Sequence, residues 1–206
     1  KTIRVIDRPG FLVNCLLLPY LGEGVMALEQ SDVSAKAIDA EARKFGLPMG
    51  PFTVLDVVGL DTAYLVAEFM AKSYPGKIKL GTLFKALVDA GRLGKKAGVG
   101  FYDLDGSHEP IGVFLERTYG PRPAVSAEEV FEKMKVLFLS ESVQAFQYGV
   151  TSKNEIETGA RIGIGFPGDG PLHFVDEMGA GNLVEQLRVF ESKLGSRFAP
   201  AKLLVD

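Results

Sequence analysis

Apolar residues recur at helical spacing along most of the chain. From Phe11 to Leu28 they fall on one face at intervals of three and four residues, which predicts a first helix. The same spacing predicts further helices at 34–45, 52–57, 62–73, 80–90, 127–148, 153–162, 171–178 and 181–194. Weak alternation over Lys1–Ile6 predicts one short strand, and no later segment has the pattern of a sheet. The chain is therefore predicted to be all-α.

Local signals place the ends of several helices. Ser34 is expected to cap the second helix, and Asp61 is expected to cap the helix over 62–73. Ser126 and Ser152 are each followed three residues later by a glutamate, which is the pattern of a capping box. Three prolines and three glycines make residues 103–124 the best candidate for a linker.

A repeat divides the chain into two parts. Five residues recur 118 positions later, and four more recur 120 positions later, on capping, turn and core positions together. The pairs are Glu23/Glu141, Ala27/Ala145, Ser34/Ser152, Ile38/Ile156, Ala42/Ala160, Gly50/Gly170, Pro51/Pro171, Asp56/Asp176 and Gly59/Gly179. We interpret them as a duplication: a first helical unit with its linker over 1–120 and a second over 121–206, related by a pseudo-two-fold axis.

Composition excludes several classes of protein. The 206 residues carry a formal charge of −3, which does not favour nucleic acid or an anionic membrane surface as a partner. No apolar run is long enough to span a bilayer. The single cysteine, Cys15, excludes an internal disulfide and fits a reducing compartment.

Few residues offer chemistry on their own. His108 lies in the candidate linker as a solvated residue, His173 favours a hydrogen-bonded structural role, and no spacing indicates a metal site. The glycines of 159–165 favour a helix end and a turn over a phosphate loop. Lys95 and Lys96, in a glycine-flanked loop, form either a solvated basic turn or a contact to a phosphate-bearing ligand. Asn14 lies on the apolar stripe of the first helix, so its amide needs partners in the fold or on a ligand; the residues alone favour the fold.

Three ordered motifs resemble the C-terminal domain of 3-hydroxyacyl-CoA dehydrogenases. They are Arg-Pro-Gly-Phe-Leu-Val-Asn at 8–14, Phe-Gly-Leu-Pro-Met-Gly-Pro-Phe at 45–52 with Leu-Asp-Val-Val-Gly-Leu-Asp at 55–61, and Gly-Arg-Leu-Gly-Lys-Lys at 91–96 with Gly-Phe-Tyr at 100–102. This resemblance covers residues 1 to about 104. The remainder, with Gly-Ile-Gly-Phe-Pro at 163–167, resembles the second, degenerate copy found in multifunctional β-oxidation enzymes.

The resemblance implies a fold, and it implies which functions belong to this chain and which to a preceding domain. Both units would be of the 6-phosphogluconate dehydrogenase C-terminal-like type, and the second copy would replace the partner subunit of dimeric relatives. In this family a preceding Rossmann domain binds NAD and supplies the catalytic histidine and its glutamate. We therefore expect no catalytic and no metal-binding residue in this chain, and no activity from it alone. Residues 1–7 would be the remnant of that domain, and an enoyl-CoA hydratase domain usually precedes it.

The resemblance also assigns site residues. Asn14 matches the asparagine that contacts the substrate oxygen, and Pro48, Met49 and Gly50 match a turn near the 3-hydroxyacyl-CoA substrate. Lys96 matches a lysine that reaches the cofactor.

Three positions depart from the family pattern. Cys15 stands where an arginine is common, Ile162 stands where a tyrosine may touch substrate, and Glu132 stands where the second copy would repeat Asn14. The second copy is therefore expected to be structural.

Two alternatives remain open. The chain could be a helical dimerisation module with no role in an active site, or a relative from the wider β-hydroxyacid dehydrogenases, against which the turn at 48–51 argues. A bacterial protein of this family would be expected in the cytoplasm, and a eukaryotic one in peroxisomes or the mitochondrial matrix.

Overall fold

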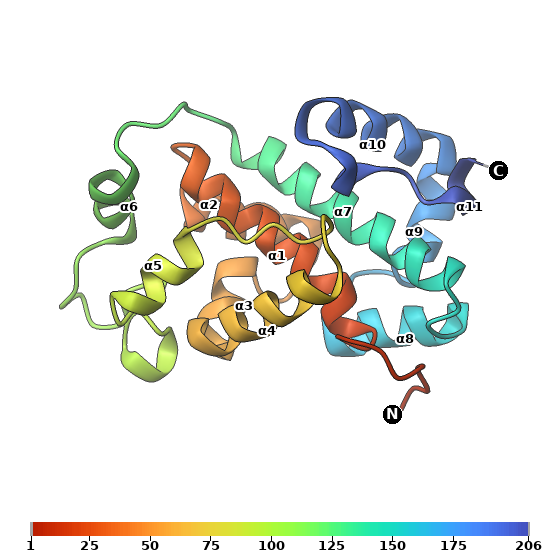
Figure 1. Ribbon diagram of the computed structural model, residues 1–206, viewed down its shortest axis with the longest axis horizontal. Coiled ribbons are helices and arrows are strands. Elements are labelled where there is room, and N and C mark those ends of the chain that lie inside the picture. Colours follow the sequence, from red (N-terminus) through yellow and green to blue (C-terminus); the bar gives the residue numbers. More distant parts are fainter. Residues whose placement is uncertain (1, 206) are drawn as a thin grey trace.

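The computed structural model describes residues 2–205 and confirms the all-α prediction (Figure 1). Lys1 and Asp206, the ends of the predicted strand and of the predicted second unit, lie outside the described residues. In chain order the helices are α1 Val13–Gln30, α2 Ala35–Phe45, α3 Pro51–Val58, α4 Leu60–Ser73, α5 Leu83–Asp89, α6 Ile111–Tyr119, α7 Ala127–Gln147, α8 Lys153–Gly163, α9 Pro171–Met178, α10 Ala180–Leu194 and α11 Lys202–Val205. Two 3-10 turns, η1 Lys95–Ala97 and η2 Ser196–Phe198, complete the order.

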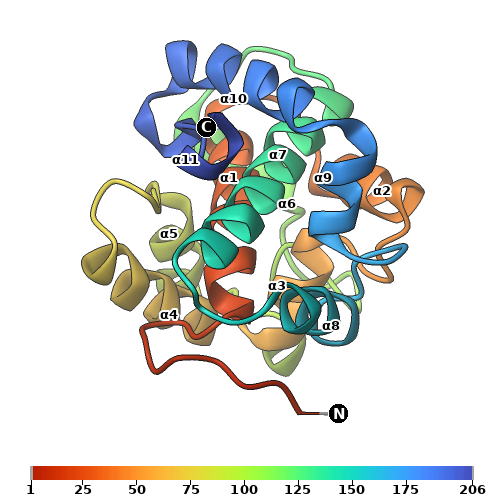
Figure 2. The ribbon, with the colours of Figure 1, turned by 90° about the vertical axis from the view of Figure 1, so that its right-hand side faces the viewer.

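The two longest helices form the centre of the molecule. α1 and α7 pack along each other, and the remaining helices lie around this pair (Figures 1 and 2). Tyr20 of α1 meets Phe131 and Phe138 of α7 edge to face, with ring centroids 6.4 and 6.1 Å apart. One continuous hydrophobic core draws buried residues from both parts of the chain. We call residues 2–120 the N-terminal half and residues 121–205 the C-terminal half.

Equivalent positions in the two halves make equivalent bonds. The hydroxyl of Ser34 accepts the N–H of Ala37, and the hydroxyl of Ser152 accepts that of Glu155, so both predicted caps are confirmed. Asp39 accepts the N–H groups of Phe52 and Thr53 at the start of α3. Glu157, 118 positions after Asp39, accepts those of Leu172 and His173 at the start of α9.

Several local predictions were wrong. Residues 2–6 form no strand, because they have no neighbouring strand to pair with; the Ile6 N–H donates to Val150 O and the Arg4 N–H to the Glu155 carboxylate. α4 begins at Leu60 after Gly59, so Asp61 lies inside the first turn and does not cap it. The segment 103–124 is not a plain linker, because it contains α6, and α5 begins only at Leu83.

None of the helices in residues 2–205 is both long and apolar enough to cross a lipid bilayer.

Candidate functional site

Asn14 lies in the first turn of α1, beside an open groove. Its side chain is half-buried and lines the groove together with Val5, Gly10 and Phe11. The backbone N–H of Asn14 donates to Gly10 O at 3.2 Å. Within residues 2–205 its side-chain amide has no hydrogen-bond partner, so the amide is open to a ligand.

A strained turn sets the start of α1 and therefore the position of Asn14. Gly10 and Phe11 are both in the left-handed region, with φ of 79° and 49°, and Phe11 is 55% exposed. The positive φ favours glycine at position 10, and a Cβ there would also come within 2.4 Å of the flexible end of the Met70 side chain in α4. The turn is held by Pro9 O, which accepts hydrogen bonds from the Tyr74 hydroxyl and the Cys15 thiol.

Arg8 and Cys15 lie close to Tyr74 beside the start of α1. Arg8 donates from Nε to the Tyr74 hydroxyl at 2.8 Å and lies over the same ring. Cys15 is buried, and burial raises the pKa of its thiol. Cys15 is therefore a neutral, packed side chain.

The turn at Pro48, Met49 and Gly50 presents two exposed side chains above one buried glycine. A Cβ on Gly50 would lie 2.2 Å from Cγ of Asp39, so the turn closes onto that carboxylate only because the residue is glycine. Asp39 is fully buried and also accepts the hydroxyls of Thr53 and Tyr102, at 2.6 and 2.9 Å. Burial, and next the charge of Asp39, raise the pKa of Tyr102.

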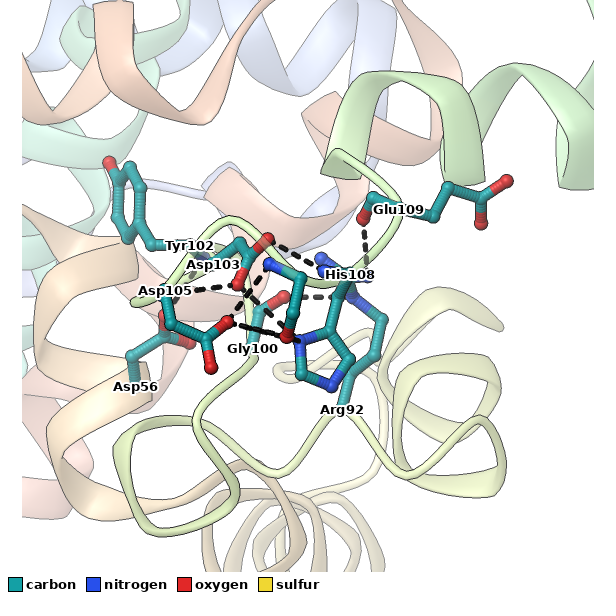
Figure 3. A network of polar contacts seen from close by, with 9 residues as sticks. Asp56, Arg92, Gly100, Tyr102, Asp103, Asp105, His108 and Glu109 are labelled. Carbon is teal, nitrogen blue, oxygen red and sulfur yellow. Dashed lines mark hydrogen bonds and ion pairs between the residues drawn. The ribbon is translucent and has the colours of Figure 1, made fainter.

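Two buried charged residues, Asp56 and Arg92, anchor the segments next to the loop that carries Lys96 (Figure 3). Asp56 accepts the N–H groups of Phe101 and Tyr102 at 2.8 and 2.9 Å, and burial raises the pKa of its carboxyl. Arg92 donates from Nε to Gly100 O at 2.9 Å and from Nη1 to Glu109 O at 2.8 Å. The loop is therefore rigid where it enters and leaves η1.

Lys96 itself is half exposed at the junction of α3 and α4. Its Nζ lies 2.6 Å from both carboxylate oxygens of Asp61, and this bond lowers the pKa of Asp61. The ammonium group also lies beside Gly59, because a Cβ built there would be 3.4 Å from Nζ.

The end of α8 links Asn14 to the turn at Pro48. Gly159 and Gly163 lie against Leu12 and Val13 at the start of α1. A Cβ on Gly165, just after α8, would come within 2.5 Å of Pro48. The start of α1 and the turn at Pro48 thus both pack against the end of α8, whereas Lys96 pairs with Asp61. Ile162 in this segment is 65% exposed.

Sequence reasoning overlooked Asp39, although it connects the turn at 48–50 to the Lys96 loop. Its partners lie 13, 14 and 63 residues away, so no local spacing marks it. The one available signal was Glu157, an acidic residue 118 positions later in the repeat.

Both histidines lie at the surface. His173 has its Nε2 3.5 Å from Glu177 and 3.8 Å from Asp169, and its ring is 46% exposed. His108 lies in the loop after Tyr102, where its Nδ1 is 2.9 Å from the Ser107 hydroxyl (Figure 3). Ligand atoms of Asp103, Asp105 and His108 lie within 4.8 Å of one another, a grouping that the sequence analysis did not anticipate. The two carboxylates accept N–H and hydroxyl groups of the same loop, which accounts for the arrangement.

Comparisons with known proteins identify the family of this chain. The 3-hydroxyacyl-CoA dehydrogenase C-terminal domain family matches residues 10–104 and 130–206. The fatty acid oxidation complex subunit alpha of Shewanella baltica (strain OS185) is 35% identical over 210 residues, covering 98% of this chain and 30% of that protein. The corresponding subunit of Vibrio vulnificus (strain CMCP6) is 33% identical over 203 residues, covering 96% and 29%. The chain thus spans about a third of the length of these curated relatives.

Solved structures share the fold. A 3-hydroxybutyryl-CoA dehydrogenase from Escherichia coli K12 superposes with a TM-score of 0.85 at 21% identity, covering 98% of this chain and 60% of that one. The dehydrogenase part of multifunctional enzyme 1 from C. elegans gives a TM-score of 0.69 at 18% identity, covering 97% and 48%. With the family match over most of its length, this chain belongs to the 3-hydroxyacyl-CoA dehydrogenase C-terminal domain family.

Proposed function

We propose that this chain forms one wall of the active-site cleft of an NAD-dependent (S)-3-hydroxyacyl-CoA dehydrogenase of fatty-acid β-oxidation. The catalytic histidine and its glutamate would come from a preceding NAD-binding domain, so the chain alone would be inactive. The single observation that carries the proposal is the Asn14 amide, which has no partner within residues 2–205 and opens onto the groove at the start of α1.

Asn14 would act by donating an amide N–H to the 3-oxygen of the substrate. A donor fixed by a rigid turn costs no reorganisation when charge develops on that oxygen, so it stabilises the transition state. NAD, when bound, supplies the hydride acceptor. Pro48 and Met49, exposed above the buried Gly50, would line the substrate side of the wall, with the flexible thioether of Met49 adapting to the acyl chain.

Lys96 would contribute to the cofactor side. Its ammonium group is half exposed and is held at the end of α3 by Asp61 and by a loop anchored through Arg92. A surface ion pair of this kind contributes little to stability, so the lysine can turn towards an anionic group of a cofactor at low cost. A dinucleotide fold would have to come from outside this chain, because residues 2–205 contain no β-sheet.

The C-terminal half would replace the second subunit of a dimer. Glu23 of α1 pairs with Arg197 at 2.9 Å, and Lys77 pairs with Glu141 of α7 at 3.1 Å. Glu141 follows Glu23 by 118 positions, and Arg197 follows Lys77 by 120. In a two-fold interface residue i contacts j and residue j contacts i, so two crossed pairs are the pattern of a fused dimer.

The relatives support a longer parent chain. They are named subunits of a fatty acid oxidation complex, and this chain covers 30% of the first of them. We propose that the parent chain carries the NAD-binding domain and an enoyl-CoA hydratase domain before this one.

The test is Asn14→Ala in the full-length enzyme. We expect kcat/KM for a 3-hydroxyacyl-CoA to fall about 100- to 1000-fold, the cost of one oxyanion-type donor, while the free energy of unfolding changes by less than about 1 kcal/mol. The matched control is Asn154→Ala, because Asn154 is an exposed asparagine in the first turn of α8.

The rival hypothesis, a helical dimerisation module without a role in the active site, predicts unchanged turnover for both variants. Equal kcat/KM for Asn14→Ala and Asn154→Ala would reject our assignment.

A further inference from the structure

Arg122, in the loop between α6 and α7, is a buried cation whose hydrogen-bonding capacity is unused. Its side chain is only 8% exposed, and within residues 2–205 neither Nε nor Nη1 has a hydrogen-bond partner. Nη2 lies 4.0 Å from Oδ1 of Asp32, which is too far for a hydrogen bond. Buried donors without partners are rare and cost free energy, more so when the group is charged. A ligand that accepts hydrogen bonds from Arg122 would therefore bind favourably.

Arg122 lines a cavity with room for a small molecule. The cavity has a volume of about 190 Å³, and its other lining residues are Asp32, Gly112, Glu116, Gly120 and Pro121. A cavity of about 150 Å³ in a protein core is known to hold benzene. A Cβ built on Gly112 or Gly120 would meet nothing within 4 Å, so both glycines border open space.

The cavity lies at the N-terminal end of α7. The N–H of Asp32 donates to Pro123 O at 2.8 Å, just before the Ser126 cap of that helix. Residues 2–6 and α11 are bonded instead at the C-terminal end of α7 (Figure 1). Since α7 has 21 residues, the two ends of the helix are about 30 Å apart. The walls of the cavity are therefore formed by α6 and by the loops that follow α1 and precede α7.

The charges around the cavity favour a ligand that carries both signs. Arg122 supplies one positive charge, and the exposed side chains of Asp32 and Glu116 supply two negative charges. A simple anion would pair with the guanidinium but would be repelled by the two carboxylates, and a simple cation would leave the guanidinium unpaired. A molecule with a carboxylate and an ammonium group pairs with both sides, because guanidinium N–H groups match the planar geometry of a carboxylate.

We propose that this cavity binds a small zwitterion of the α-amino-acid class. The carboxylate of the ligand accepts hydrogen bonds from Arg122, and its ammonium group donates to Glu116 and Asp32. The cavity shares no lining residue with the groove at Asn14, so the proposal does not depend on the proposed dehydrogenase function.

The probe is L-alanine, titrated into the isotope-labelled 206-residue protein and followed by NMR. We expect saturable shifts of the Nε–H signal of Arg122 and of the backbone amides of Gly112 and Gly120, with a Kd of about 1 mM or lower. Acetate and methylammonium each carry only one of the two charges of the ligand. Both are expected to bind at least about tenfold more weakly than L-alanine.

Two substitutions test the two charged sides of the cavity separately. Arg122→Lys keeps the positive charge but loses the planar donor group, so the Kd for L-alanine should rise about tenfold or more. Glu116→Gln removes one carboxylate, so it should weaken the binding of L-alanine and strengthen that of acetate. The Tm of each variant checks that it is folded.

The matched control is Arg117→Lys, which makes the same change one helical turn or less from Glu116. The Arg117 side chain is 63% exposed, pairs with Glu109 and lies outside the cavity. This substitution should change the Kd for L-alanine by less than about twofold, because an exposed ion pair contributes little.

Three results would overturn the proposal. The first is the absence of saturable shifts with L-alanine. The second is acetate or methylammonium binding as tightly as L-alanine, which would mean that the cavity recognises a single charge. The third is an unchanged Kd for L-alanine in Arg122→Lys.

Discussion

Asp39 illustrates how a single buried side chain can organise a site that it does not itself line. Its carboxylate accepts two N–H groups at the start of α3 and two hydroxyls, so it fixes the turn at Pro48 relative to Tyr102. No local pattern could identify it, because every one of these partners is distant in sequence. The sequence did identify Gly50, but only the structure explains why it must be glycine.

Gly50→Ala is expected to destabilise the protein. The backbone of Gly50, with φ −76° and ψ 163°, is accessible to alanine, so the effect is purely the contact with Asp39. We expect a loss of about 1–3 kcal/mol in the free energy of unfolding, measured by urea denaturation.

Gly181→Ala serves as the control, because a Cβ in that first turn of α10 would meet nothing within 4 Å. It should be neutral or stabilising by up to about 1 kcal/mol. Equal effects of the two substitutions would disprove the steric account of the turn.

At the level of elements, the spacing of apolar residues predicted most helices. It failed for segments whose structure depends on contacts with the rest of the fold. The predicted bounds of α9 match the structure, and those of α7 and α10 differ by one residue. The Ser126 cap marks the start of α7, and Pro171 at the first position marks the start of α9. α6 was missed because prolines and glycines surround it, although Phe114 and Leu115 bury its inner face. The strand predicted over residues 1–6 was wrong. Alternation of apolar and polar side chains fits a strand, but a strand forms only when another strand is available to pair with it.

The junction between residues 2–6 and α8 predicts a pH dependence. Glu155 accepts hydrogen bonds from the Thr151 hydroxyl, the Arg4 N–H and the Ser152 hydroxyl, which lower its pKa from 4.5 to about 2. The lowered pKa means that the folded state favours the charged carboxylate of Glu155. These hydrogen bonds therefore stabilise the folded protein fully above pH 4.5, and this stabilisation is lost as the pH falls towards 2.

Glu155→Gln should therefore lower the Tm at neutral pH and flatten its decline between pH 4.5 and 2, as measured by calorimetry. Glu185→Gln, at an exposed position of α10, should leave the profile of the native protein unchanged. If Glu155→Gln and the wild-type protein show the same dependence of Tm on pH, the role assigned to the hydrogen bonds of Glu155 is wrong.

For the whole molecule, the crossed ion pairs join the halves most specifically. The side chains of Arg197 and Glu23 are 6% and 8% exposed, whereas Lys77 is 35% exposed. Removing one member of a buried pair leaves an uncompensated charge, so Arg197→Ala is expected to cost about 3–5 kcal/mol in the free energy of unfolding. Lys77→Ala should cost less, because Lys77 is partly exposed and solvent already screens its ion pair.

Chemical denaturation of both variants checks this order. Lys85→Ala, which removes an exposed pair with Asp89, should cost no more than about 1 kcal/mol. If Arg197→Ala were as mild as Lys85→Ala, the buried pair would contribute no more to stability than an exposed surface pair.

The central claim is that Asn14 faces the reacting oxygen from the wall formed by this chain. A crystal structure of the full-length enzyme with a 3-oxoacyl-CoA bound tests it most directly. We predict that Nδ2 of Asn14 lies within hydrogen-bond distance, about 2.7–3.2 Å, of the 3-oxygen, with Pro48 and Met49 beside the acyl chain. A thioester bound away from the start of α1, with the Asn14 amide turned to another protein group, would contradict the account.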